Sequence, residues 1–170
     1  MENGLPALLI AAILMLSTVF MARGGFMGAD AIGQSLRQSE VRYEAKSRTG
    51  LTITASTIDA TGANITLTVR NDGQTVLADY ASMDVVLQYF GETGIRRDVW
   101  IPFTSGVLAS NTWKTGIFTN DVFEPGILNS GESMQMLIRV NPVVGRLTTN
   151  LAVIGSEKGV TAQTYFAGPP

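Results

Sequence analysis

The side chains that could carry chemistry in this sequence are a few scattered acids and one sequon. Carboxylates are the ligands that Ca²⁺ prefers, and those near predicted loops are Asp72, Asp79, Asp84, Asp121 and Glu124. Their spacing does not match the calcium loop of EF-hand proteins, so solvated loop acids are the simpler interpretation. The sequence therefore predicts no metal site and no cofactor.

Catalysis is disfavoured by two missing residue types. The chain contains no His and no Cys, which excludes thiol nucleophiles, Ser–His–Asp triads and the usual zinc ligand sets. His is also the side chain best suited to proton transfer near neutral pH. No phosphate-binding glycine loop is present, and spacing alone identifies no carboxylate pair for hydrolysis. We therefore expect no catalytic residues and no enzyme activity.

The only sequon for N-linked glycosylation is Asn64-Ile65-Thr66. Asn64 is thus a candidate glycosylation site if the domain is extracellular. Ile65 falls in a predicted strand, however, and the motif is short enough to occur by chance. Both interpretations stay open on the sequence alone.

The charge balance argues against nucleic acid as a partner. Charged residues make up 15% of the 170 residues, and the net charge is -2. A nucleic-acid-binding surface requires a basic stripe, which this composition does not supply. We therefore expect no nucleic-acid partner.

The first part of the chain is an apolar run without a single charge, from Leu5 to Ala22. As a helix of about 18 residues it would nearly span the hydrocarbon core of a bilayer. A secretory signal would need basic residues before the run, and none is present. A permanent membrane anchor is the second interpretation. The third, which we favour, is a mature protein from which a basic leader has been removed.

The helical pattern continues beyond Arg23, so we expect one helix over residues 1–48, too long for a bilayer to cover. Its apolar side chains are expected to act in membrane anchoring before assembly and in self-assembly afterwards. They are Leu5, Leu8, Leu9, Ile10, Ile13, Leu14, Leu16, Val19, Phe20, Phe26, Ile32 and Leu36. Glu2 is a candidate to neutralise the N-terminal amine of a neighbouring copy, and a solvated end is the alternative.

From residue 49 to residue 170 the apolar period changes from helical to two, as in β-strands. Seven segments alternate or are apolar enough for strands, at 51–56, 63–70, 83–90, 97–101, 133–140, 147–154 and 160–166. Turn signals such as Asn71-Asp72-Gly73 separate them. No amphipathic helix lies among them. The fold class predicted is therefore α+β, with a long hydrophobic helix followed by an all-β immunoglobulin-like sandwich.

These parts together resemble archaellins and related type IV pilin-like filament subunits. The string Asn71-Asp-Gly-Gln-Thr-Val-Leu77, followed by Met83-Asp-Val-Val-Leu-Gln-Tyr89, resembles the early strands of archaellin β-domains. Trp113 and the run Pro125–Glu132 resemble a segment shared by archaellins and stator-type single-pass proteins of the archaellum. The resemblance covers nearly the whole chain with loose motifs. It departs from type IV pilins at the fifth position, where Leu5 replaces the common Glu.

The resemblance implies a function and a set of partners. It implies removal of a leader by a prepilin-type peptidase, insertion in the cytoplasmic membrane, and delivery by an assembly platform into an extracellular filament for motility or adhesion. The chain would be its own main partner, as a helical homopolymer with the helices in the core. The alternative is a single-pass stator-type or envelope-binding protein that uses the same sandwich to hold a partner.

Overall fold

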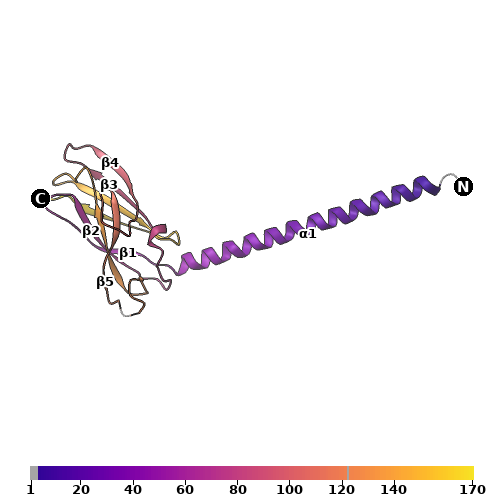
Figure 1. The fold of residues 1–170 in the computed structure, drawn as a ribbon, viewed down its shortest axis with the longest axis horizontal. Helices are drawn as coiled ribbons and strands as arrows, with labels where there is room; N and C mark the ends of the chain where they lie inside the picture. Colours follow the sequence, from indigo (N-terminus) through magenta and orange to yellow (C-terminus); the bar gives the residue numbers. More distant parts are fainter. Residues whose placement is uncertain (1–3, 122) are drawn as a thin grey trace. The chain divides into compact units, whose positions relative to one another are not determined.

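The computed structural model describes residues 4–121 and 123–170 and divides the chain into two compact units, Met1–Tyr43 and Glu44–Pro170. The described residues of the first unit belong to a single helix, α1, which runs from Gly4 to Arg48 (Figure 1). At about 1.5 Å per residue such a helix is roughly 68 Å long. Leu, Ala, Met and Ile dominate its first half, and all of these residues tolerate helix well.

The last turn of α1 belongs to the second unit and has a clear end signal. Lys46 and Arg48 lie in this turn, where positive charge complements the helix dipole. The amide of Thr49 donates to the carbonyl of Lys46 at 3.2 Å, and its hydroxyl donates to the carbonyl of Ala45 at 2.7 Å. The carbonyls at the helix end are therefore partly satisfied before the first strand begins.

The second unit is a sandwich of two antiparallel sheets, each with four strands (Figure 1). One sheet has the order β1-β2-β6-β5 and the other the order β4-β3-β7-β8. The strands are β1 (Thr52–Ile58), β2 (Asn64–Arg70), β3 (Asp84–Phe90), β4 (Arg96–Ile101), β5 (Thr112–Thr119), β6 (Ser133–Arg139), β7 (Thr149–Gly155) and β8 (Thr161–Ala167). A short 3-10 helix, η1 (Tyr80–Ser82), precedes β3. The β-sandwich predicted from the alternating pattern is confirmed.

The core follows from alternation along each strand. In β2, Ile65, Leu67 and Val69 are buried, and they pair with the buried Ile138, Met136 and Met134 of β6. The same alternation buries one face of β3 and β7. Since a register shift of one residue would move every buried side chain to the surface, this pattern fixes how the strands pair.

An aromatic cluster closes the side of the core next to β5. Trp113 is fully buried, and its ring meets that of Phe103 edge-on with centroids 4.9 Å apart. Tyr80 lies against Phe103 and Phe118 at 6.3 and 6.2 Å. The hydroxyl of Tyr80 donates to the carbonyl of Gly126 at 3.0 Å, which satisfies the polar end of a half-buried ring.

Because Tyr80 is half-buried, its hydroxyl is expected to ionise at a higher pH than that of a free tyrosine. Desolvation raises the pKa of Tyr80 from 10.0 to about 12. Because the neutral form is favoured in the folded state, its contribution to stability is present below pH 10 and is lost as the pH rises toward 12. Titration of tyrosinate absorbance in the full chain should show a step near pH 12 that is missing in Tyr80→Phe. A Tyr80→Phe curve identical to that of the wild type would contradict this assignment.

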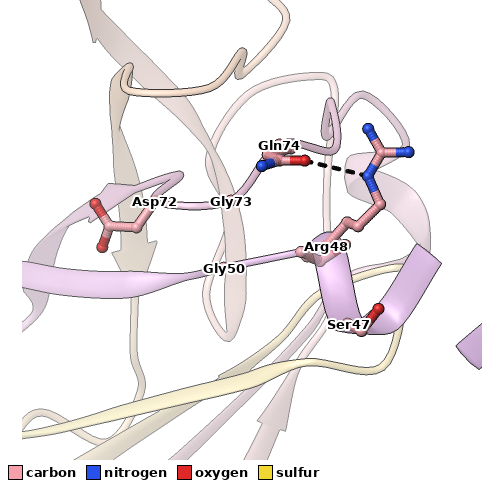
Figure 2. Close-up of a pocket in the computed structure, with 7 residues that line it drawn as sticks. Ser47, Arg48, Gly50, Asp72, Gly73 and Gln74 are labelled. Atoms are coloured by element: carbon pink, nitrogen blue, oxygen red, sulfur yellow. Dashed lines mark hydrogen bonds between the residues drawn. The ribbon is translucent and has the colours of Figure 1, made fainter. Parts of the chain in front are cut away.

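The connection from α1 to the sandwich is a tight backbone contact between residues 48–50 and 72–74 (Figure 2). The amide of Gln74 donates to the carbonyl of Arg48 at 2.7 Å, and the amide of Asp72 donates to that of Gly50 at 3.2 Å. A Cβ on Gly73 would overlap the amide nitrogen of Gly50 and come within 2.6 Å of the Arg48 carbonyl. Only glycine allows this approach.

Asn71 ties this contact to the core. Its side chain is fully buried and donates to the carbonyls of Thr75 and Leu128 at 2.8 and 3.0 Å. Its side-chain oxygen accepts from the amide of Gly73 at 3.0 Å. The turn predicted at Asn71-Asp72-Gly73 is therefore a hub that joins the helix end to the loop before β6.

Two details of the strand pattern were predicted wrongly. Leu147 was expected to begin a strand, but β7 begins at Thr149. Leu147 has a φ of 55° and its amide donates to the carbonyl of Pro169, so it lies outside the sheet ladder. Strand β5 was not among the predicted segments, because its register shifts between Thr115 and Phe118 and breaks the alternation.

Candidate assembly surface

The first half of α1 exposes large apolar side chains along its length. Those whose placement is described between residues 9 and 21 are 57–77% exposed. They are Leu9, Ile10, Ile13, Leu14, Met15, Leu16, Phe20 and Met21. Seven of them fall within about 160° of the helix circumference and Met15 lies on the opposite side, and no side of the helix carries a charge between residues 5 and 22. A helix with no charged side is typical of one buried in a bundle or a membrane.

The two polar residues within this run are already satisfied. The hydroxyl of Ser17 donates to the carbonyl of Leu14 at 2.9 Å, and that of Thr18 donates to the carbonyl of Met15 at 2.8 Å. Burying a hydroxyl normally costs free energy when the hydroxyl has no hydrogen-bond partner. Because both hydroxyls already donate to backbone carbonyls, their burial does not carry this cost. The segment can be surrounded by apolar groups without further polar partners.

The second half of α1 alternates apolar and charged side chains. Ile32 and Leu36, two of the predicted assembly residues, are exposed one helical turn apart. Val41 and Tyr43 are also exposed, and neither belongs to the predicted assembly set. Beyond residue 36 the charged residues are Arg37, Glu40, Arg42, Glu44, Lys46 and Arg48. This half suits a partner surface that is partly polar.

Some predicted assembly residues cannot be placed. The side chains of Leu5, Leu8, Val19 and Phe26 belong to α1 but are not among those described. Glu2 lies outside the described residues. Its proposed role at the N-terminal amine of a neighbouring copy stays a prediction. No helix in the described part of the chain meets the length and hydropathy expected of a membrane span.

Asn64 is the first residue of β2, and both the nitrogen and the oxygen of its side-chain amide are hydrogen-bonded. Its Nδ2 donates to Asp59 Oδ2 at 2.6 Å, and its Oδ1 accepts from Arg139 Nε at 3.0 Å. Asp59 also accepts from the backbone amides of Ala63 and Asn64. A glycan replaces one of the two hydrogens on Nδ2, and the remaining hydrogen would have to stay directed at Asp59.

Glycosylation at Asn64 therefore stays a prediction from the sequon. The hydrogen bonds that Asn64 makes in the fold argue against it. We expect the fraction of chains carrying a glycan at Asn64 to be low, because the folded turn holds its nitrogen. Intact mass spectrometry of chain from the native host, with Asn64→Gln as the reference, measures this. A wild-type mass above that of the variant by one glycan in most chains would contradict it.

The loop acids are dispersed, and most have local partners. Asp72 pairs with Arg70 at 3.0 Å, Asp79 accepts from Ser82, and Asp84 accepts from the indole of Trp100 at 3.0 Å. Across residues 4–121 and 123–170, no group of three or more acids is close enough to hold a metal ion.

Comparison with known proteins gives structural matches only. No protein-family model and no curated protein matches the sequence. Among solved structures, the periplasmic stator protein FlaG of the Sulfolobus acidocaldarius archaellum matches 69% of this chain and 99% of its own, with a TM-score of 0.51 and 17% identity. The flagellin FlaB1 of Methanocaldococcus jannaschii matches 71% of this chain and 90% of its own, with a TM-score of 0.53 and 14% identity.

The third structure includes the helix. The archaeal flagellum of Methanospirillum hungatei matches 97% of this chain and 93% of its subunit, with a TM-score of 0.58 and 11% identity. The fold is archaellin-like. At these identities the likeness concerns the fold alone, and it is shared by a filament protein and a stator protein. The archaellin-like resemblance of the sequence is thus confirmed at the level of the fold.

Proposed function

We propose that this protein is a structural subunit that polymerises into an extracellular helical filament, with copies of α1 packed in its core. The observation that carries this proposal is the uncharged surface of α1 between Leu9 and Met21, on which eight large apolar side chains are exposed. In water, eight large apolar side chains at this exposure would cost roughly 10 kcal/mol per chain. The chain needs a partner that surrounds the helix, and identical helices provide one.

The second half of α1 supports a filament over a stator. Ile32 and Leu36 lie in a part of the helix beyond the reach of a bilayer that holds residues 5–22. A single-pass anchor has no use for exposed apolar side chains there.

The second candidate function is a single-pass, stator-type or envelope-binding protein. The likeness of the sandwich to FlaG favours it. In that case lipid would cover the first half of α1, and the sandwich alone would contact the partner. The two candidates differ in whether copies of α1 contact one another.

A route to the filament follows from the same surface. Before assembly, lipid would cover residues 5–22, and the satisfied hydroxyls of Ser17 and Thr18 would allow this. A prepilin-type peptidase and an assembly platform would process and export the chain. The mature filament would lie on the cell surface and serve motility or adhesion. In this role the chain is structural, and its described residues offer no catalytic grouping.

Shearing of whole cells tests the proposal. Released appendages are pelleted, examined by negative stain, and their main band is sequenced from its N-terminus. Filaments built of this chain support the subunit function. Recovery of the chain only in the detergent-soluble membrane fraction, with no filament, would reject it and favour the anchored protein.

A further inference from the structure

The outer faces of the two sheets differ sharply in composition. The outer face of β4-β3-β7-β8, here the apolar face, exposes Trp100, Tyr165, Val86 and Phe90. The outer face of β1-β2-β6-β5, here the threonine face, carries Thr57, Thr66 and Thr68; its strands β1, β2 and β6 expose no large apolar side chain, and β5 exposes Ile117. The exposed aromatic side chains of the apolar face mark it as an interaction surface.

Strand register gathers the apolar side chains into neighbouring rows. Trp100 pairs with Val86, Val86 with Val153, and Val153 with Gln163, so these four residues cross the sheet in one line. The next row contains Asp98, Gln88, Leu151 and Tyr165. Side chains in adjacent rows are close enough to form a continuous patch.

Within this patch, the side chain of Trp100 is exposed and already held in one orientation. It is 58% exposed, and its indole Nε1 donates to Asp84 Oδ1 at 3.0 Å across the strand pair. The hydrogen bond restricts the ring before any partner arrives, so little entropy is lost on contact. Exposed Trp and Tyr are the residues most often found at the energetic centre of interfaces.

The two faces differ in their balance of charge. The threonine face carries Arg70, Lys114 and Arg139, of which Arg70 pairs with Asp72, and none of its four strands contains an acid. The apolar face carries Asp84, Asp98 and Arg96 on outward positions, and Arg96 lies 3.4 Å from Asp98. Contact between two threonine faces would bring cations together, whereas contact between unlike faces brings acids to cations.

The exposed apolar area is too small for a stable dimer. Aromatic side chains offer about 150–250 Å² each, so the patch presents roughly 400–500 Å² of apolar surface at the observed exposures. A stable pair needs about 800 Å² per partner. A patch of this size suits neighbours that a second contact already holds together, which raises their effective concentration.

We infer that the apolar face of one copy packs against the threonine face of the next copy. This inference rests on the proposed filament, in which α1 supplies the second contact. Because the two surfaces are different, each copy offers one of each, and the contact propagates instead of closing on itself. Face-to-back packing of sandwiches would thus form the outer layer of the polymer.

Cross-linking in the full chain tests the inference, since the natural sequence has no Cys to interfere. Gln163→Cys places a thiol on the apolar face, and Thr68→Cys places one on the threonine face. The full chain is assembled by detergent removal, pelleted, and treated with a short flexible bismaleimide. Pelleting measures assembly independently of cross-linking.

The expected result is a ladder of dimers, trimers and longer species in the double variant, with no cross-link in either single variant. Adding Trp100→Ser to the double variant should lower the yield about tenfold, as loss of an interface anchor does. Trp100 is exposed, so this change leaves the core intact. Adding Val107→Ser, an exposed apolar side chain in the loop between β4 and β5 and outside both faces, should leave the ladder pattern in place.

Three other outcomes would overturn the inference, and they separate it from the proposed function. Dimers in Gln163→Cys alone would mean that two apolar faces meet. Pelleted filaments without a ladder would mean that the sandwiches do not pack in this way, while the filament proposal stands. Failure of the wild-type chain to pellet would reject the filament itself and the inference with it.

Discussion

Leu14→Lys is expected to abolish assembly while the sandwich stays folded. Leu14 is 60% exposed on α1, within a run of exposed apolar side chains that contains no charge. In a dry helical core, an unpaired ammonium would cost on the order of 5 kcal/mol. Since each 1.4 kcal/mol is tenfold in an equilibrium constant, the concentration needed for assembly should rise by more than about 1,000-fold. Pelleting after detergent removal measures this directly.

The matched control is Gln38→Lys, which adds the same charge at an exposed polar position of the same helix. We expect it to assemble as the wild type does. Circular dichroism should show the β-sandwich unchanged in both variants, because neither position belongs to the sandwich. Normal filaments from Leu14→Lys would show that this side chain does not lie in a dry core.

Gly73→Ala is expected to cost about 3 kcal/mol or more of unfolding free energy. All three atoms nearest to the added Cβ are backbone atoms of residues 48–50, which cannot turn away as a side chain can. Relief requires the separation of residues 48–50 from 72–74, with loss of the Gln74 and Asp72 hydrogen bonds. The melting temperature of the full chain should fall by on the order of 10 °C.

Gly106→Ala is the matched control for this change. A Cβ at Gly106 would meet only the hydroxyl of Thr104, at 3.7 Å, which is ordinary contact. We expect its melting temperature to stay within a few degrees of the wild type. Equal melting temperatures for Gly73→Ala and the wild type would mean that the close approach of Gly50 and Gly73 relaxes at little cost.

The sandwich could be predicted because its core depends on a local signal. Ile65, Leu67 and Val69 alternate with polar residues, and this alternation alone places them on one face. The same alternation did not predict strand β5. Gly116 lies where a Cβ would come within 3.0 Å of Leu137, and the register shifts around it, so the apolar residues on its two sides fall out of phase.

The surfaces were harder to predict than the core. Trp100 and Trp113 are chemically identical in the sequence, yet one is exposed and the other is fully buried. Their difference depends on which face of each strand turns inward, and on the pairing of Val86 with Trp100. The apolar face of β4-β3-β7-β8 therefore had no sequence signature. The exposed residues of α1, by contrast, were predictable from the lack of charge in residues 5–22.

The contact between residues 48–50 and 72–74 has a mechanical consequence. A flexible linker would act as a soft spring, and it would absorb a pull or a twist before the β-domain felt it. Here the last helical turn is joined by backbone hydrogen bonds to the turn after β2, and through Asn71 to the loop before β6. A load on Arg48 would therefore pass through these hydrogen bonds to β2 and β6, the two central strands of their sheet. In a polymer of such subunits, residues 44–50 would move with the β-domain and would not act as a soft linker.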